Sequence, residues 1–261
     1  DDKLNFAPGA GWAWTPSDAW RVRAGAGVFY MQDTGNPRFD MARNAVGRRN
    51  DTSDPLRLNL NWDAPFVGSG TNACGVQPPI VCISQHYVLG NMYDRKTPYM
   101  YQYVFNVQRQ LGKVTSLEIG YLGSQSKRLE RMFDRNEVVP GPGLAQTRRP
   151  YPEFTKIQEI GNVAEAKYNS MGLKVTRRLD DGLSVLFSYT LSKSTDNGSG
   201  IRVLNGDALF PQNSECFECE WGPSIFDVRH RMVMSVLYEL PFGGDKPFLQ
   251  EGIGGAIFGG W

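Results

Sequence analysis

Strict alternation of apolar and polar residues is the dominant pattern of this chain, and it is clearest between Leu183 and Lys193. Every second residue from Leu183 to Leu191 is apolar, and serine or threonine fills the positions between them except at Leu186. Side chains alternate between the two faces of a strand. The segment therefore predicts a strand with one apolar and one polar face.

Six other segments show the same pattern. We expect strands at residues 4–14, 20–30, 98–111, 114–123, 167–179 and 226–241, and a further strand starting at the GGW that ends the sequence. The connections alternate between short turns, such as Gly112-Lys113 and Asp180-Asp181-Gly182, and long polar loops. The long loops are expected at residues 31–97, 124–166 and 195–225. This rhythm is typical of an antiparallel transmembrane β-barrel, an all-β fold with short periplasmic turns and long extracellular loops.

The alternation also assigns faces and an orientation. Trp14 and Trp20 are expected near the periplasmic rim, and Tyr30, Tyr99 and Tyr101 near the outer rim, as in the aromatic girdles of such barrels. In the last strand, Val228 and Met232 share the apolar face. The charged residues on the apolar faces are Arg109 and Arg177, and both lie at the turn ends, where a long side chain can reach the interface. A soluble sandwich would also alternate, but its loops need not alternate in length.

Charged residues on the polar faces are candidates for lining the lumen. They are Arg21, Arg23, Glu118, Lys174, Arg178, Asp227, Arg229, Arg231 and Glu239. Six of these nine are basic and three are acidic. One interpretation is attraction of an anionic ligand or salt bridges to a plug domain, and the other is a solvated wall in which the acidic residues balance the basic ones.

The composition and net charge of the sequence leave the prediction of a membrane β-barrel unchanged. The 261 residues include 28 Lys and Arg against 27 Asp and Glu, a net charge of +1 that gives no support for a nucleic-acid partner. No run approaches the roughly 20 apolar residues of a membrane-spanning helix. The sequence opens at DDKLNF without an initiator Met or signal peptide and stops at GGAIFGGW, and we expect both ends to lie within a longer protein.

The four cysteines lie in two of the long loops. Local disulfides are expected between Cys74 and Cys82 and between Cys216 and Cys219, because an even count in cell-surface loops favours pairing. The spacing of Cys216 and Cys219, with three glutamates around them, also fits a redox or metal site. A zinc site needs four ligands, however, and no second CxxC or His pair lies close.

No arrangement of residues points to catalysis. The two histidines, His86 and His230, are not spaced with a nucleophile and a carboxylate, and the RAGAGVFY stretch lies inside an alternating strand with no helix after it. We therefore expect no catalytic residues, no metal site and no cofactor, and we expect the protein not to be an enzyme.

Several segments together carry a family resemblance. They are NFAPGAGWAW, WRVRAGAGVFY, TPYMYQYVFNVQRQL, LEIGYLGSQSKRL, YNSMGLKVTRRLDDGLSVLFSYTLSKSTDN and FDVRHRMVMSVLYELPFG. As a set they resemble the β-barrel of TonB-dependent outer-membrane transporters of the Oar-like group. The resemblance implies a 22-stranded barrel plugged by an N-terminal domain, energy supplied through TonB, and a carboxypeptidase-regulatory-like domain ahead of the plug.

The sequence departs from the complete family pattern. It holds no recognisable plug or TonB box, so residues 1–261 are expected to be a partial barrel domain of about seven or eight strands, and the energy-coupling residues of the family have no counterpart in it. The expected function is part of a transporter that moves a bulky ligand across the outer membrane. Its expected partners are outer-membrane lipid, the TonB complex through the plug, and an unidentified ligand. A surface adhesion or interaction protein and a passive porin-like channel are the alternatives.

Overall fold

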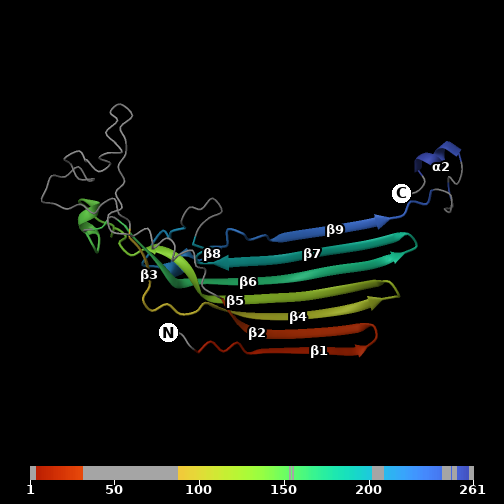
Figure 1. The fold of residues 1–261 in the computed structure, drawn as a ribbon, viewed down its shortest axis with the longest axis horizontal. Helices are drawn as coiled ribbons and strands as arrows, with labels where there is room; N and C mark the ends of the chain where they lie inside the picture. The colour runs from red at the N-terminus through yellow and green to blue at the C-terminus, as the bar shows by residue number, and fades with distance from the viewer. Residues whose placement is uncertain are drawn as a thin grey trace, which may run out of the picture.

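The computed structural model describes residues 4–31, 88–152, 154, 156–201, 209–242, 248 and 252–258. Within these residues, nine strands form one sheet, and long antiparallel strands lie side by side in chain order (Figure 1). The long strands are β1 (Gly9–Ser17), β2 (Trp20–Tyr30), β4 (Tyr99–Leu111), β5 (Thr115–Asp134), β6 (Ile157–Asp180), β7 (Leu183–Asp196) and β9 (His230–Tyr238). The predicted all-β antiparallel fold is therefore confirmed.

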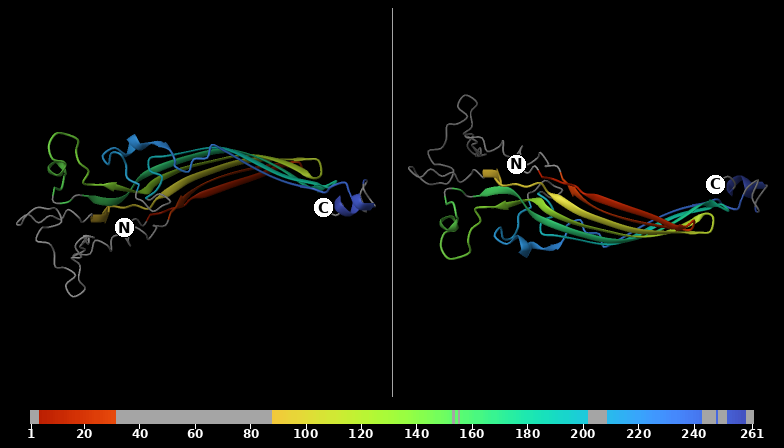
Figure 2. Two further views of the ribbon diagram at one scale, coloured as in Figure 1. Left: turned by 90° about the horizontal axis from the view of Figure 1, so that it is seen from above. Right: turned by 90° about the horizontal axis from the view of Figure 1, so that it is seen from below.

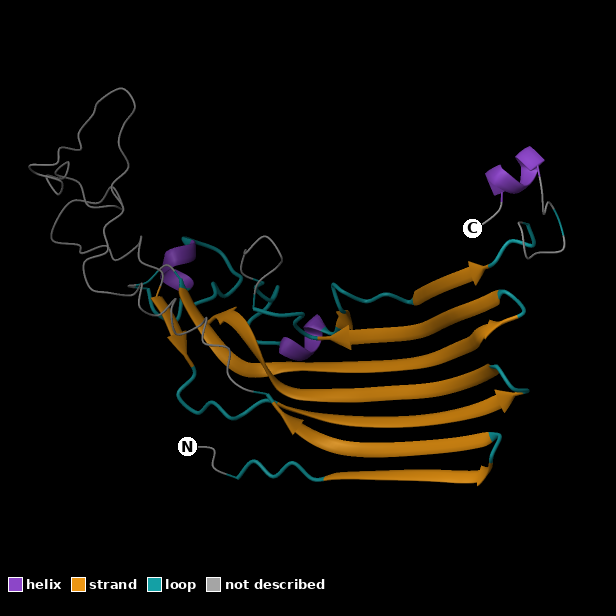
Figure 3. Cartoon of the chain, turned by 45° about the vertical axis from the view of Figure 1, so that its right-hand side comes forward, coloured by secondary structure: helices purple, strands orange, loops and turns teal. Residues whose placement is uncertain are grey.

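The sheet is open and curved. β1 lies at one edge and β9 pairs with β7 at the other, and the views from above and below show the strands following one arc (Figure 2). The short hairpin turns gather at one end of the strands and the long connections at the opposite end (Figure 3). We call these the turn end and the loop end.

The tight turn between β6 and β7 has the geometry that the sequence predicts. Asp181 and Gly182 have φ angles of 50° and 73°, and two successive residues with positive φ are the signature of a two-residue hairpin turn matched to strand twist. Glycine adopts this conformation without steric cost, and aspartate tolerates it.

Strands β5 and β6 are much longer than predicted, so the expected loop at 124–166 is wrong in large part. β5 continues to Asp134 and β6 begins at Ile157. The 24 residues of β6 extend about 80 Å, whereas a membrane-spanning strand needs about 9–11 residues. Alternation fails here for two reasons. The register of β5 and β6 shifts between Ser126 and Arg131, and residues 131–133 are all buried, so both faces are covered.

The last long strand is shorter than predicted. β9 begins at His230, whereas residues 226–229 were expected to belong to it. Here Asp227 Oδ1 accepts a hydrogen bond from the backbone N–H of Ser194 at 2.6 Å, and the Val228 carbonyl accepts one from Ser192 Oγ at 2.7 Å. These hydrogen bonds, each involving a side chain, replace part of the backbone hydrogen-bond ladder between β7 and the residues before β9. The chain therefore bulges beside the loop end of β7.

Short elements occupy both ends of the sheet. The loop predicted at 31–97 contains β3 (Val88–Asn91), which pairs in parallel with the start of β6, and the third loop contains η3 (Phe217–Glu220) and β8 (Gly222–Pro223). The others are η2 (Ala145–Arg148) and α2 (Gly252–Phe258). The expected GGW strand lies outside the described residues. In the described part of the chain, no helix has the length and apolar character needed to span a membrane.

A compact core forms at the loop end, away from the flat part of the sheet. Leu89 of β3, Met132 of β5 and Ile160 of β6 are all but inaccessible, and Ile201 and Phe210 pack against them. We call this region the cap. It comprises β3, residues 129–164 and residues 194–224 as far as the structure describes them. The rest of the sheet, from residue 126 of β5 and 166 of β6 to the turn end, is the wall.

Candidate lumen surface and its two faces

Strand register unites the predicted apolar sides into one continuous apolar face. In an antiparallel sheet, directly paired residues point to the same side. One row of such pairs crosses the wall through Trp14, Val22, Val107, Ile119, Leu173, Tyr189 and Met232. Large side chains of this face are exposed, for example Met171 at 56% and Met232 at 68%. An apolar surface of this extent requires lipid or another apolar partner.

The opposite, polar face carries small, hydroxyl-bearing and charged residues. A parallel row of pairs crosses it through Ala13, Arg23, Asn106, Gly120, Gly172, Thr190 and Arg231. The glycines leave room for larger neighbours, since a Cβ at Gly120 would lie 2.1 Å from Asn106 Oδ1. The sheet thus presents one apolar and one polar surface, as the wall of a membrane β-barrel does.

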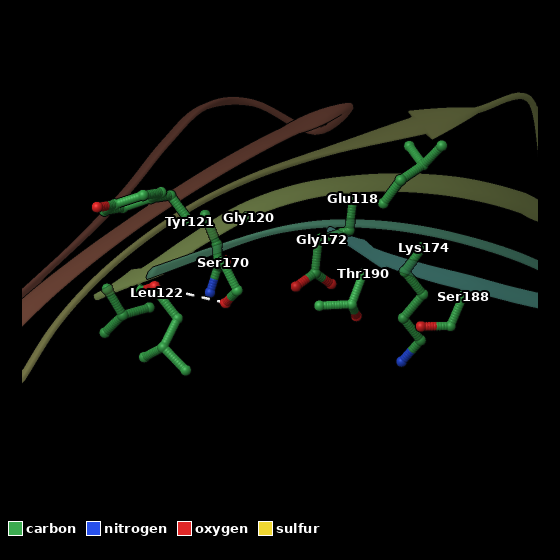
Figure 4. Close-up of a pocket in the computed structure, with 12 residues that line it drawn as sticks. Glu118, Gly120, Tyr121, Leu122, Ser170, Gly172, Lys174, Ser188 and Thr190 are labelled. Carbon is green, nitrogen blue, oxygen red and sulfur yellow. Dashed lines mark hydrogen bonds between the residues drawn. The ribbon is translucent and has the colours of Figure 1, made fainter. Parts of the chain in front are cut away.

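A shallow hollow of about 290 Å³ lies on the polar face of β4–β7. Glu118, Lys174, Ser188, Thr190 and Ser170 point into it from the concave side of the sheet, while the Tyr121 ring lies on the other side (Figure 4). Glu118 and Lys174 are directly paired across β5 and β6, so opposite charges face one another in the middle of the wall.

The other lumen candidates lie at several heights on the same face. Arg21 is paired with Gln108 on β4, and Arg231 with Thr190 on β7. Arg178 is at the turn end, where its guanidinium donates to the Lys113 carbonyl at 3.0 Å, and Glu239 lies beside the β6–β7 turn through its backbone bond to Gly182. The charges are therefore distributed along the wall, and they do not converge on one centre.

The bulge between β8 and β9 creates a second hollow, of about 660 Å³, near the loop end. Phe226 and Val228 line it together with Ser192 and Ser194 of β7, and Arg231 lies at its edge. Val228 was predicted on the apolar face, and the bulge places it against the polar face instead. Asp227 and Arg229 belong to the same bulge, and their atoms bond to the backbone of β7.

The third loop contains a disulfide. Cys216 and Cys219 are joined across η3, with their Cα atoms 5.4 Å apart. The single helical turn presents Phe217 to Phe133, at a ring-centroid distance of 5.2 Å. The disulfide therefore lies beside the Phe217–Phe133 contact of the cap, and neither sulfur is a free thiol. Cys74 and Cys82 lie outside the described residues.

A buried polar network in the cap is the feature that the sequence did not reveal. Arg131 is 4% exposed, and its guanidinium donates to the Asn197 carbonyl and pairs with Glu220 at 3.4 Å. Burial lowers the pKa of Arg131, while the Glu220 carboxylate opposes that shift. Two charged residues far apart in the sequence offer no local pattern, so only the fold brings them together.

Asn136 is the centre of the second part of the network. It is fully buried, its amide donates to the carbonyls of Tyr151 and Phe154 at 2.9 and 2.8 Å, and its Oδ1 accepts from the Tyr151 N–H at 2.8 Å. Asp134 Oδ1 accepts from the N–H groups of Asn136 and Ile157. These bonds hold Tyr151 and Phe154 against the ends of β5 and β6.

The described residues hold no cluster of three or more His, Cys, Asp or Glu arranged to bind a metal ion. His230 Nδ1 is hydrogen-bonded to Tyr189 Oη at 2.8 Å on the apolar face. That contact is a packing interaction between neighbouring strands.

The open, two-faced antiparallel sheet defines the class: it is a section of a membrane β-barrel wall. The sequence matches the family model for the outer membrane beta barrel domain over residues 1–261. The chain belongs to this family and is an outer-membrane protein. No curated protein matches the sequence.

Among solved structures, those similar in fold include two transporters and a siderophore receptor. The FrpB iron transporter of Neisseria meningitidis shares 13% identity (TM-score 0.40), and the outer membrane transporter YddB of Escherichia coli shares 14% (TM-score 0.46). The matches cover 73% and 77% of this chain but only 20% and 21% of theirs. The siderophore receptor PirA of Pseudomonas aeruginosa shares 10% identity, with 90% of this chain and 42% of PirA covered (TM-score 0.32).

Proposed function

We propose that this domain is part of the barrel wall of a TonB-dependent transporter that moves a bulky ligand across the outer membrane. The observation that carries the proposal is the continuous polar face on the concave side of the sheet, opposite an apolar face. The resemblance of the strand segments to Oar-like transporters supports the TonB-dependent class. Energy would enter through a plug domain encoded elsewhere in the complete protein.

In this proposal, the wall offers a ligand many weak contacts and no single tight one. The Glu118–Lys174 pair and Arg231 are separated along the polar face, and the hydroxyls of Ser188 and Thr190 lie between them. A ligand released by a displaced plug would pass from group to group because no cluster of like charges holds it. The same dispersal of polar groups supports a domain without enzymatic activity.

One observation favours a second function, binding of a partner at the cell surface. β5 and β6 continue past the length that a bilayer needs and end in a cap with its own core. A packed projection of this kind could present a rigid epitope to a matrix or another cell. A passive porin-like channel is the third candidate, and it requires a lumen without a plug.

The proposal is tested with the full-length protein purified from outer membranes. We expect it to bind the isolated periplasmic domain of TonB, measured by calorimetry, and we expect liposomes containing it to resist swelling in the trisaccharide raffinose. Swelling without TonB binding would support the porin and contradict the transporter. We also expect TonB binding to survive deletion of residues 209–221. That result would show that this part of the cap is not needed for coupling to TonB.

A further inference from the structure

A group of basic side chains lies on the apolar face of the sheet, where the wall meets the cap. They are Lys127, Arg128, Lys167 and Lys193, and we call them the basic band. None of them belongs to the lumen candidates, because strand pairing places them on the opposite side of the sheet. They are therefore not explained by transport through the lumen.

The register fixes the side of the sheet for the three lysines. Lys127 is paired with Tyr99, Lys167 with Gln125 and Thr195, and Lys193 with Asn169. Tyr99 is in turn paired with Tyr30, and both belong to the apolar face. Arg128 lies within a register shift of β5 and has a φ of 58°, and its guanidinium lies 5.1 Å from the centre of the Tyr99 ring. All four cations thus belong to the same face.

The three lysines form a diagonal across β5, β6 and β7. Each is offset by two residues from the position paired with the next, and such diagonal neighbours in a sheet are about 7–8 Å apart at their Cα atoms. Three flexible ammonium groups at this spacing can surround one headgroup that carries more than one negative charge.

The band has a net positive charge. Lys127 forms an ion pair with Glu165, and Lys167 Nζ lies 5.2 Å from the centre of the Trp221 ring. Lys193 is exposed and has no ion pair among the described residues. Four cations and one carboxylate leave a charge of +3. An unneutralised basic surface beside a bilayer attracts anionic lipid headgroups.

The apolar belt begins directly beside the band. The next row of pairs toward the turn end passes through Phe105, Tyr121, Met171 and Leu191, whose side chains are large and exposed. Between the two, Tyr121 Oη donates to Asn169 Oδ1 at 2.7 Å. A molecule with a charged head and apolar tails matches this order of surfaces, whereas a free anion would use the band alone.

We propose that the basic band binds the phosphate-bearing headgroup of a lipid in the outer leaflet, with the acyl chains lying on the belt below it. The loop end is extracellular in outer-membrane barrels, so the band faces that leaflet. Charge complementarity and the continuity of the band with the belt select a lipid over free phosphate. The site acts independently of ligand transport.

The test uses the full-length protein in detergent and native mass spectrometry. The probe is bis-phosphorylated lipid A, compared with the same lipid after removal of both phosphates, and inorganic phosphate is a separate competitor. We expect the bis-phosphorylated lipid to be retained. The double variant Lys167→Gln with Lys193→Gln should bind it about 30-fold more weakly, the factor expected from two cations near an anionic surface.

Matched variants separate this site from general attraction. Arg109→Gln with Arg177→Gln removes the same charge from the same face at the turn end, and we expect it to retain the lipid, as does Lys167→Arg with Lys193→Arg. Equal loss in the turn-end variant, equal binding of the dephosphorylated lipid, or full displacement of the lipid by millimolar phosphate would each overturn the proposal. Heat-shifted mobility on gels verifies that each variant barrel is folded.

Discussion

The wall and the cap share two strands, β5 and β6, yet they are stabilised in different ways. In the wall, successive residues alternate between two half-exposed faces, and no described side chain on the apolar face is fully enclosed by the sheet. In the cap, Arg131, Met132 and Phe133 follow one another and are all buried. The cap has a hydrophobic core and an internal polar network of its own.

Different interactions therefore stabilise the two regions. The wall depends on backbone pairing and on its surroundings, lipid on one side and the aqueous lumen on the other. The cap depends on side chains that meet from distant parts of the chain. Substitutions that truncate buried side chains should therefore destabilise the cap. Truncation of the half-exposed side chains of the wall should cost little, whereas changes in its hairpin turns should destabilise it.

The largest expected effect is from Met132→Ala in the cap core. Met132 is 1% exposed, so its truncation should cost about 2–5 kcal/mol of local stability. Hydrogen exchange of the β3 and β5 amides in the full-length protein measures this loss. Met171→Ala on the apolar face is the control and should cost less than about 1 kcal/mol, because that side chain is half exposed. Equal losses would contradict the distinction between cap and wall.

Asn136→Ala should have the next largest effect. Three hydrogen bonds to Tyr151 and Phe154 would be lost, and at a net contribution of about 0.5–1.5 kcal/mol each the total loss is about 1.5–4.5 kcal/mol. We expect rapid protease cleavage within residues 137–156 while the wall stays intact. Asn106→Ala, on the open polar face, should leave the cleavage rate unchanged, and similar cleavage in both variants would argue against a preorganised cap.

Replacing both Cys216 and Cys219 by serine should loosen η3 by about 2 kcal/mol, as loop entropy predicts for so short a loop. Phe217 would then leave Phe133 and Arg131, and exchange at residues 217–221 should accelerate. Dithiothreitol should reproduce the effect in the unmodified protein and add nothing in the double variant. If reduction leaves exchange unchanged, η3 is held by its other contacts.

The smallest expected loss of stability comes from a substitution in a hairpin turn of the wall. Gly182→Ala places a side chain at a φ of 73° and brings its Cβ to 3.2 Å from that of Glu239, and we expect a cost of about 1–2 kcal/mol. Gly172→Ala on the polar face has no atom closer than 4.0 Å and should change stability by less than about 0.5 kcal/mol. Urea titration of barrel unfolding compares them, and the reverse order would mean that the wall does not depend on turn geometry.

The candidate lumen residues also differ in how well the sequence predicted their positions. Glu118, Lys174, Arg21 and Arg231 could be assigned to the polar face from alternation, because register in the wall has no shift at these positions. The bulge that moves Val228 against the polar face could not be foreseen. It depends on hydrogen bonds between β7 and residues 227–228, and the bonded residues are 33 and 36 positions apart in the sequence.

Sequence alone determined the strands of the wall, their two faces and the positions of their turns, because period-2 alternation is a local property of each strand. Only the tertiary structure decided how far β5 and β6 extend, which residues form the cap, and that Lys127, Lys167 and Lys193 lie in one diagonal. Those features depend on register between strands and on burial of both faces at once, and neither leaves a periodic trace in a single segment of the sequence.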